Sequence, residues 1–365
     1  MIKKDIMRAA VISLNSESSR NIANELKKFF NEVDHISLKD VDVTLANEKF
    51  EVLYKGEQLK KYDCIYARGS FRYASVLTSL TSALKDTTYM PLKPHSFTIG
   101  HDKFLTQLHF QHKKIPMPEA YIAATSSAAK KILKKISYPI MIKVPHGTHG
   151  KGVLYAESYA SASSMCDALT VMNQPFIIQE YIETGGTDIR AIVAGGKVVS
   201  SYKRKAEKSE SRANYHAGGT GEPYVLDAHE QKIAIDAAKA IGSDLCAVDL
   251  VVCSTKGPLV IEVNLSPGLQ GITKVTKQNV AEKVARALYE KARIFKDRSQ
   301  NGTYGQMIKE LDESKLAQQE IISNLEFRGD RILLPKITTD LAGFKSEKEY
   351  VIKATKGKIL IKDNL

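Results

Sequence analysis

Short apolar runs alternate with amphipathic segments over the first part of the chain. The run Ala9–Leu14 has the length and composition of a buried strand, and Ile22 and Leu26 recur at helical spacing directly after it. We expect strands at residues 9–14, 33–36 and 62–68, with a helix between the first two. This alternation predicts a small domain with a parallel sheet, which we place at residues 1–94.

Two further units follow, in which strands and helices again alternate. In residues 95–184 we expect helices at 101–112, 126–135 and 160–172 and strands at 140–144, 153–156 and 176–179. In residues 185–295 we expect strands at 188–193, 198–203, 247–252 and 259–264 and helices at 228–241 and 280–295. The pattern predicts an α/β chain in which the N-terminal parallel-sheet domain precedes two α+β subdomains.

The remaining stretch, residues 296–365, has a different composition. Asp297–Gly305 is polar and predicts a linker, and Met307–Leu325 predicts an amphipathic helix. Glu349–Lys362 alternates apolar and polar positions around Lys356-Gly357, which indicates a small hairpin. We interpret this stretch as a C-terminal appendage that serves either oligomerisation or the docking of a substrate.

Composition narrows the class of protein. With 43% hydrophobic and 26% charged residues the chain is expected to fold as a globular protein, and no apolar run approaches the length of a membrane span. We find no signal peptide at the start. The four cysteines are scattered without ligand spacing, which favours free thiols in a reducing cytoplasm: Cys64, Cys166, Cys246 and Cys253.

The formal net charge is +12, and it is open to three interpretations. A basic chain suits a nucleic acid or anionic small molecules such as a nucleotide and a polycarboxylate, whereas most of the lysines could simply be solvated surface. No basic stretch is interleaved with aromatics and no nucleic-acid motif is present. The charge therefore favours anionic ligands, and only weakly.

A glycine-rich loop lies between two predicted strands. Lys143 ends the first strand, and Gly147, Gly150 and Gly152 follow in a G-x-x-G-x-G pattern. Phosphate loops that open a helix have a different spacing, but a glycine-rich loop between strands can fold over phosphates and offer backbone N–H groups. Lys143 would add a cation. A glycine-rich hairpin without any ligand is the alternative.

Two predicted strands that each carry one acidic residue form a second candidate site. A turn at Ser254–Gly257 joins them, and pairing Cys253 with Pro258 puts Asp249 opposite Glu262. Asn264 shares the face of Glu262 because side chains alternate along a strand. Facing carboxylates destabilise a sheet unless a cation lies between them, and this ligand set suits Mg²⁺. The alternative, two solvated acids on an exposed face, is disfavoured by their apolar neighbours.

Two other segments carry weaker signals. Gln179–Glu183 closes a strand and could offer backbone groups to the edge of an adenine, although such segments are mostly structural. The polar loop Lys203–Gly219 contains arginines that could clamp a carboxylate or phosphate, and an ordinary solvated basic loop is its alternative.

Taken in this order, the segments resemble the ATP-grasp superfamily, specifically RimK-type amino-acid ligases. The resemblance covers about residues 8–293. It rests on these motifs: I-G-H-D-K (99–103), M-I-K-V-P-H-G-T-H-G-K-G-V (141–153), Q-E-Y-I-E (179–183), D-I-R (188–190), S-R-A-N-Y-H-A-G-G (211–219), A-V-D-L-V (247–251) and P-L-V-I-E-V-N-L-S-P-G-L-Q-G-I (258–272).

The resemblance implies two subdomains that enclose ATP, and a role for each matching residue. Contacts to ATP are implied for Lys103, Lys143, Gly147, Gly150, Gly152, Glu180, Tyr181, Ile182, Asp188, Arg212 and Asn214. The last two would also hold the acyl phosphate as catalytic residues. Two Mg²⁺ ions, or Mn²⁺ in their place, would be bound by Asp249, Glu262 and Asn264. Substrate contacts are implied for Arg190, Arg204, His216 and Ser266.

The implied reaction is an ATP-dependent ligation of a carboxylate to an amine through an acyl phosphate. The substrates would be an amino acid, with glutamate as one candidate, and an acidic peptide, protein tail or small-molecule carboxylate. Two alternatives stay open: a peptide-modifying ligase whose appendage docks a leader segment, and a non-catalytic nucleotide-binding protein on the same fold. A homo-oligomer is compatible with the resemblance, whereas a membrane or nucleic-acid partner is not expected.

Overall fold

The computed structural model describes residues 6–46, 49–145, 152–205, 220–313, 326–329, 331–334, 339, 342–345, 348–355 and 358–363. The chain divides into two compact units, Met1–Gln300 and Asn301–Leu365. Gly147, Gly150, Arg212, Asn214 and His216, which were predicted as site residues, lie outside the described ranges.

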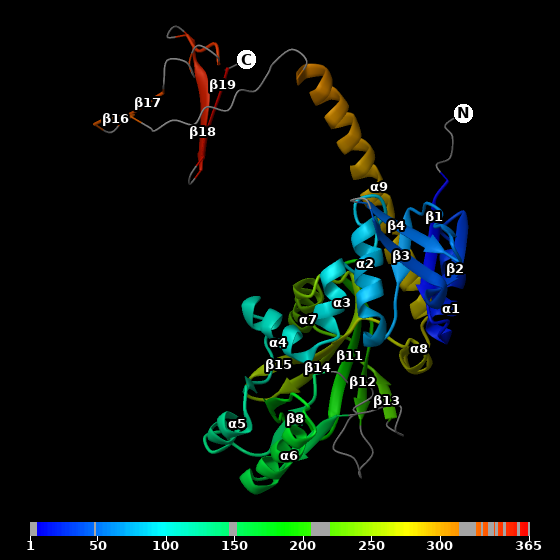
Figure 1. The fold of residues 1–365 in the computed structure, drawn as a ribbon, viewed down its shortest axis with the longest axis vertical. Helices are drawn as coiled ribbons and strands as arrows, with labels where there is room; N and C mark the ends of the chain where they lie inside the picture. The colour runs from blue at the N-terminus through cyan, green and yellow to red at the C-terminus, as the bar shows by residue number, and fades with distance from the viewer. Residues whose placement is uncertain are drawn as a thin grey trace. The chain divides into compact units, whose positions relative to one another are not determined.

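The first unit begins with a parallel sheet, as the alternating pattern predicts (Figure 1). Its strand order is β2-β1-β6, and both neighbours run parallel to the central strand. The bounds are β1 (Arg8–Ser13), β2 (Glu32–Ser37) and β6 (Cys64–Ala67). Helix α1 (Glu17–Leu26) connects the first two strands, and the Ser16 hydroxyl caps it by accepting from the Ser19 N–H.

Several elements near this sheet were not predicted. A small antiparallel sheet and two helices lie between β2 and residue 100: β3 (Val41–Ala46), β4 (Lys49–Tyr54), β5 (Glu57–Gln58), α2 (Ala74–Leu84) and α3 (Pro94–Gly100). Helix α4 (Lys103–His112) begins two residues later than expected, because the Asp102 side chain accepts from the Phe104 and Leu105 N–H groups and so forms the cap.

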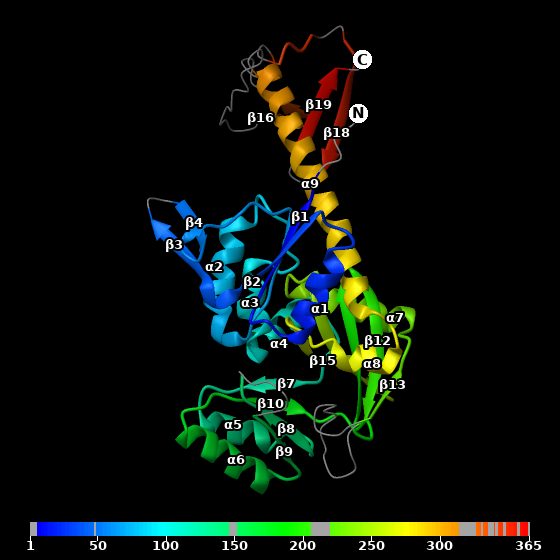
Figure 2. The ribbon, with the colours of Figure 1, turned by 90° about the vertical axis from the view of Figure 1, so that its right-hand side faces the viewer.

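A four-stranded antiparallel sheet follows, with strand order β7-β10-β8-β9. Helices α5 and α6 lie side by side against this sheet (Figure 2) and share a separate apolar core with it. The bounds are β7 (Ala120–Ile122), α5 (Ser126–Leu133), β8 (Ile140–Lys143), β9 (Val153–Ala156), α6 (Tyr159–Val171) and β10 (Ile177–Glu180).

The third sheet of the first unit has five antiparallel strands in the order β13-β12-β11-β14-β15. The elements are β11 (Thr187–Ala194), β12 (Lys197–Lys205), β13 (Thr220–Pro223), α7 (Ala228–Ala240), β14 (Leu245–Cys253), β15 (Gly257–Asn264) and α8 (Gln270–Thr276). Helix α7 is fixed at its start by a capping box between Asp227 and Glu230.

The predicted pairing of β14 with β15 is confirmed at the acidic positions. Asp249 lies opposite Glu262, although the turn is one residue shorter than expected and pairs Cys253 with Gly257 instead of Pro258. An irregularity between Asp249 and Leu250 takes up the difference of one residue. Asp249 and Glu262 are therefore paired across the two strands despite the error in the turn.

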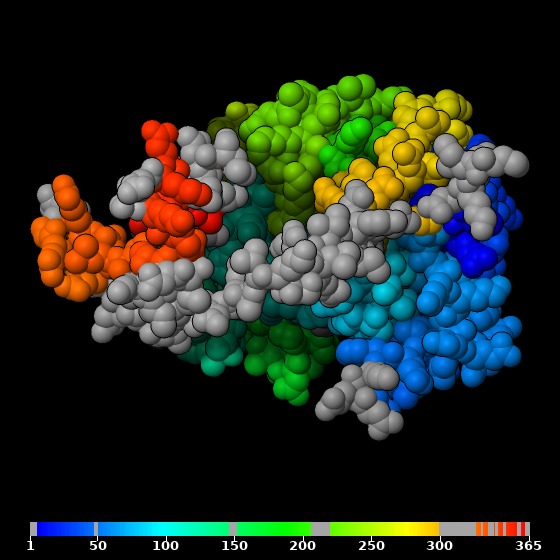
Figure 3. Space-filling view, turned by 90° about the horizontal axis from the view of Figure 1, so that it is seen from above, coloured from blue at the N-terminus to red at the C-terminus, as the bar shows by residue number. Residues whose placement is uncertain are grey.

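The predicted linker at residues 297–305 is wrong, because helix α9 (Val280–Glu313) runs through it. The segment is polar, but it has no proline to end the helix, and each of its two glycines opposes helix by only about 1 kcal/mol. Within the first unit, α9 packs on the N-terminal elements: the rings of Phe30 and Tyr289 are 5.3 Å apart, edge to face. Figure 3 shows the yellow residues of this part of the chain beside the blue N-terminal residues.

The second unit contains two short hairpins, β16 (Glu326–Arg328) with β17 (Arg331–Leu333), and β18 (Tyr350–Thr355) with β19 (Lys358–Asp363). The latter confirms the predicted hairpin, since β18 pairs antiparallel with β19 and Thr355 lies opposite Lys358. The predicted helix at 307–325 is described only as far as Glu313, as the end of α9. Among the described helices none is both long and apolar enough to cross a bilayer.

Candidate functional site

A cavity of about 640 Å³ lies in the first unit, a size that suits a nucleotide-sized ligand. Its described walls come from α4, β8, β10, the five-stranded sheet, and the segments that follow β1, β6 and β15. Eleven of the predicted site residues line it: Lys103, Lys143, Glu180, Tyr181, Ile182, Asp188, Arg190, Arg204, Glu262, Asn264 and Ser266. Of the predicted residues that the structure describes, Gly152 and Asp249 are not part of this lining.

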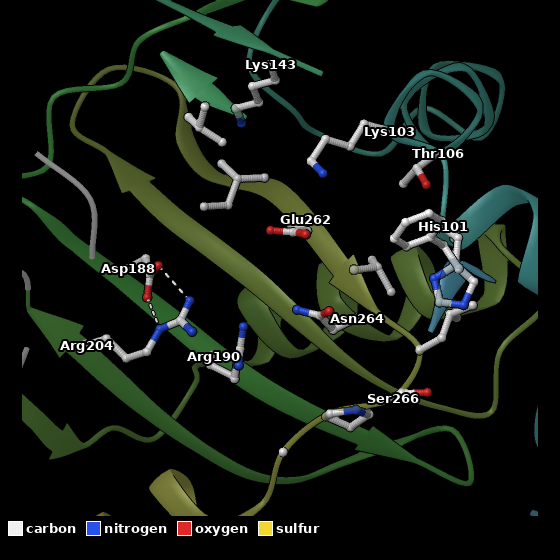
Figure 4. A pocket seen from close by; sticks show the side chains of 18 of the residues that line it. His101, Lys103, Thr106, Lys143, Asp188, Arg190, Arg204, Glu262, Asn264 and Ser266 are labelled. Carbon is white, nitrogen blue, oxygen red and sulfur yellow. Dashed lines mark hydrogen bonds and ion pairs between the residues drawn. The ribbon is translucent and has the colours of Figure 1, made fainter. Parts of the chain in front are cut away.

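Two lysines and a carboxylate face one another at the centre of the cavity. Lys103 comes from the first turn of α4 and Lys143 from the end of β8, and both amino groups point toward the Glu262 carboxylate (Figure 4). Asn264 lies beyond Glu262 on the same face of β15. This arrangement presents two cations beside a carboxylate and a carboxamide, which is the donor set that phosphates and a hard metal ion require.

The environment of Lys143 changes its titration. Burial lowers the pKa of Lys143 and nearby Lys103 lowers it further, whereas Glu262 opposes the shift, so that the pKa falls to about 8. Lys143 also donates to the Gln179 side-chain oxygen from the neighbouring strand β10. Its ammonium group is therefore held in place but is charged only in part above pH 8.

Arginines, which the sequence predicted as substrate contacts, surround the buried acids. Arg190 donates to both oxygens of Asp249 at 2.7 and 2.6 Å. Arg204 donates to both oxygens of Asp188 at 2.5 and 2.7 Å (dashed lines in Figure 4) and to Asp249 at 2.9 Å. Burial alone would raise the pKa of Asp249, but the two arginines hold it well below its usual range.

These ion pairs explain how the sheet tolerates an acidic residue, Asp249, opposite another acidic residue, Glu262. The neutralising cations at Asp249 are guanidinium groups from β11 and β12, the two strands on its other side. Three of roughly four acceptor positions of this carboxylate are occupied by N–H donors. Glu262 and Asn264, by contrast, face the cavity. No cluster of three or more His, Cys, Asp or Glu side chains suited to a metal occurs among the described residues.

Other predicted positions have structural partners. Glu180 accepts from Lys256 at 2.6 Å and from the Glu119 N–H at 3.1 Å, so its side chain holds the segment after β10 in place. Gly152 has a φ of +77°, and a Cβ there would lie 2.2 Å from a Val144 methyl. Gly152 is thus required by the backbone of the loop between β8 and β9.

Sequence reasoning missed three cavity residues that carry unpaired buried groups. They are Arg68 (Nη1), Gln107 (Oε1) and Gln179 (Nε2), whose named atoms have no hydrogen-bond partner in the described structure. Unsatisfied buried polar groups are rare in folded proteins and are concentrated where a ligand or water completes them. Gln179 lay within a quoted motif, but nothing in the local pattern around Arg68 or Gln107 marked them.

Relatives identify the fold and the chemistry together. A family model for the RimK-like ATP-grasp domain matches residues 100–288. The chain is 34% identical over 295 residues to the "Probable alpha-L-glutamate ligase 2" of Pseudoalteromonas atlantica, covering 79% of this chain and 97% of that protein. It is 33% identical to the "Probable alpha-L-glutamate ligase" of Marinomonas sp., covering 78% and 96%.

Solved structures agree on the fold. An ATP-grasp ligase named PsnB, complexed with a phosphomimetic variant of a minimal precursor, Mg and ADP, has a TM-score of 0.63 at 14% identity, covering 79% of this chain and 99% of that one. A RimK domain ATP-grasp protein from Sphaerobacter thermophilus has a TM-score of 0.60 at 18% identity, covering 76% and 98%. This chain belongs to the RimK-like ATP-grasp family and is an ATP-dependent carboxylate–amine ligase.

Proposed function

We propose that this ligase joins the amine of an amino acid, with L-glutamate as the first candidate, to a carboxylate that ATP has activated as an acyl phosphate. The names of the relatives motivate glutamate. The observation that carries the proposal is the convergence of Lys103, Lys143, Glu262 and Asn264 on one cavity. The acceptor is an acidic peptide, a protein tail or a small-molecule carboxylate, in keeping with the net charge of +12.

Each cavity residue has a proposed part in the first half-reaction. Lys103 and Lys143 bind the phosphates of ATP and offset the charge that develops as the terminal phosphoryl group moves to the substrate carboxylate. Glu180, Tyr181 and Ile182, which line the cavity, would hold the adenine, and Asp188 would contact the ribose. Arg212 and Asn214, outside the described residues, would contact the transferred phosphoryl group.

The cavity also fits Mg²⁺. Glu262 and Asn264 present oxygen donors to the same space as the lysines, and an oxygen donor set of this kind suits a hard cation that bridges phosphates. When bound, Mg²⁺ neutralises phosphate charge. We propose two such ions, with Mn²⁺ able to substitute. Asp249 would join the ligand set only by sharing its oxygens with Arg190 and Arg204.

The second half-reaction needs a free amine and no side-chain nucleophile. The amine attacks the carbonyl carbon of the acyl phosphate, the bond from that carbon to the phosphate oxygen breaks, and inorganic phosphate leaves with the electron pair. The amine loses one proton to the surroundings. Arg190 and Arg204, held by acidic partners at the cavity wall, and Ser266 and His216 are the proposed contacts to the substrates.

ADP and phosphate release tests this function. The full chain with Mg-ATP is scanned over the twenty amino acids, each combined with pooled acidic peptides and small carboxylates, beside a Glu262→Gln variant. Release that depends on one amino acid and one acceptor, and is lost in the variant, is expected. Retained ATP binding without release above the variant for any combination would contradict the proposal and favour a non-catalytic binding protein.

We expect nucleotide affinity to depend on pH through Lys143. Its pKa of about 8 in the free protein would rise when phosphates bind beside it, so binding takes up a proton above pH 8 and affinity falls as pH rises from 8 to 9.5. Below pH 8 the side chain is already charged, and this dependence fades. Titration calorimetry with Mg and a non-hydrolysable ATP analogue, in buffers of different ionisation enthalpy, measures the uptake.

The matched control is Lys143→Met, which removes the titrating group. We expect proton uptake above pH 8 to disappear in this variant and its affinity to be lower and nearly independent of pH. Equal proton uptake by the variant and the unmodified chain would show that another group is responsible.

A further inference from the structure

The cavity extends beyond the proposed nucleotide region to the N-terminal parallel sheet. Ser13, Ser16, Ser18, Arg68 and Ser70 line this part, which we call the N-terminal lobe. The chain leaves β1 toward β2 on one side, and β6 pairs with β1 on the other. In open parallel sheets this change of direction leaves a crevice at the carboxyl ends of the strands, where ligands bind. The lobe lies at that crevice.

Arg68 is the charged group of the lobe. Only 6% of it is exposed, and its backbone N–H donates to Ile12 at 2.9 Å, which continues the pairing of β6 with β1. Its Nη2 donates to the carbonyl oxygens of Ser266 and Pro267 at 2.8 and 3.0 Å. Both acceptors are neutral. A guanidinium group has five N–H donors, so the described residues leave most of its edge unused, and Nη1 has no partner.

The other buried arginines of the cavity have carboxylate partners, which Arg68 lacks among the described residues. Arg190 and Arg204 are each bound to carboxylates through two nitrogens. No carboxylate of the described residues pairs with Arg68, whose other contact is the face of the Tyr66 ring at 5.6 Å. A buried charge without a counter-ion is strongly unfavourable. An anion that enters the cavity would remove this penalty.

The position of Arg68 relates the lobe to the reaction. Ser266, whose carbonyl oxygen accepts from Arg68, lies two residues beyond Asn264, and its hydroxyl donates to the Gly69 carbonyl at 3.1 Å. The loop after β15 thus connects the phosphate region to Arg68. The amino end of α1, capped by Ser16, also lines the lobe, and the first N–H groups of a helix favour negative charge.

We propose that the N-terminal lobe binds a substrate carboxylate that is not activated, with Arg68 as its counter-ion. This inference rests on the proposed ligase function and names a specificity-determining residue for it. A carboxylate bound there is kept away from the phosphoryl group and orients the rest of its molecule toward the phosphate region. Since Nη1 is screened from solvent, the carboxylate reaches it with a local adjustment of the Arg68 side chain. The carboxylate belongs to the amine-bearing amino acid or to the acceptor.

A cycle of protein and ligand changes tests the proposal. Binding of L-glutamate and of its α-carboxamide is measured by calorimetry on the full chain saturated with Mg and a non-hydrolysable ATP analogue, for the unmodified chain and for Arg68→Met. The amide should bind the unmodified chain about 10- to 100-fold more weakly, as loss of a charged hydrogen bond predicts. Arg68→Met should bind both ligands equally weakly. Any other amino acid that supports ADP release replaces glutamate in this arm.

A second arm applies the same cycle to the acceptor found by ADP release, with its non-reacting carboxylates amidated one at a time. Coupling in the first arm assigns the lobe to the amino acid, and coupling in the second assigns it to the acceptor. Effects that simply add in both arms overturn the proposal. If ADP release persists with such additive effects, the ligase function stands and only the anion site fails.

Further variants separate charge recognition from folding. Arg68→Lys keeps the charge and should recover part of the coupling. Arg286→Met makes the same change at an exposed arginine on α9 and should alter neither ligand affinity nor coupling. Affinity for the nucleotide analogue should be unchanged in Arg68→Met, whereas a purely structural role of Arg68 would lower nucleotide and carboxylate binding together.

Discussion

Replacing Glu262 with glutamine is expected to lower ATP turnover by about 100- to 1,000-fold, the effect of removing one electrostatic group from a transition state. The substitution keeps the shape of the side chain and removes the carboxylate that faces Lys103 and Lys143 (Figure 4). It also removes a negative charge that raises the pKa of Lys143. Initial rates of ADP release at saturating Mg-ATP measure the effect.

Glu290→Gln provides the control, because Glu290 is exposed on α9 and lies outside the cavity. We expect it to leave turnover within about twofold of the unmodified chain. Activity of Glu262→Gln within tenfold of the unmodified chain, at every Mg²⁺ concentration tested, would refute a role for Glu262 in phosphoryl transfer.

Replacing Arg204 with methionine is expected to lower the free energy of unfolding by about 3–5 kcal/mol at pH 7. The side chain of Arg204 is 7% exposed, and its loss leaves buried Asp188 without its arginine and Asp249 with Arg190 alone. Urea unfolding of the variant and of the unmodified chain measures the change in the free energy of unfolding. Arg8→Met breaks an exposed ion pair with Glu32 and should cost less than about 1 kcal/mol.

The pH dependence of this loss distinguishes an unpaired charge from a packing defect. Burial raises the pKa of Asp188 to about 6 in the unmodified chain although Arg204 opposes the shift, so the loss of Arg204 should raise this pKa further. The folded variant then binds this proton at a higher pH than the folded unmodified chain does, so the destabilisation should shrink as the pH falls from 7 toward 6. A loss that is independent of pH would indicate that lost packing dominates.

The ion pairs of Arg190 and Arg204 with Asp249 could not be predicted from the pairing of β14 with β15 alone. Facing acids at Asp249 and Glu262 required a nearby cation, and Mg²⁺ was the predicted one. The structure adds Arg190 and Arg204 from the two strands beyond Asp249. A pairwise view of β14 and β15 could not include them, because the order of strands in the sheet decides which side chains are neighbours.

The sequence by itself determined the elements whose apolar periodicity is strong and whose partners are close along the chain. These include the parallel pairing of β1, the apposition of Asp249 with Glu262, and the hairpin of β18 and β19. The motif residues that line the cavity were predicted from the resemblance of their motifs to those of the RimK-type ligases. The strands β3 and β4 were missed although Val41, Val43 and Leu45 alternate with polar residues as in a strand, and β5 is only two residues long.

Only the tertiary structure decided which charges are paired and which are not. The partners of Arg204 lie 16 and 45 residues away, and the carbonyl groups that hold Arg68 lie 198 and 199 residues away. Pairing of buried charges depends on distances across sheets and loops, and local patterns carry no information about those distances. The same reason explains why Arg68, an arginine at the end of an ordinary strand, became a candidate for substrate recognition only in three dimensions.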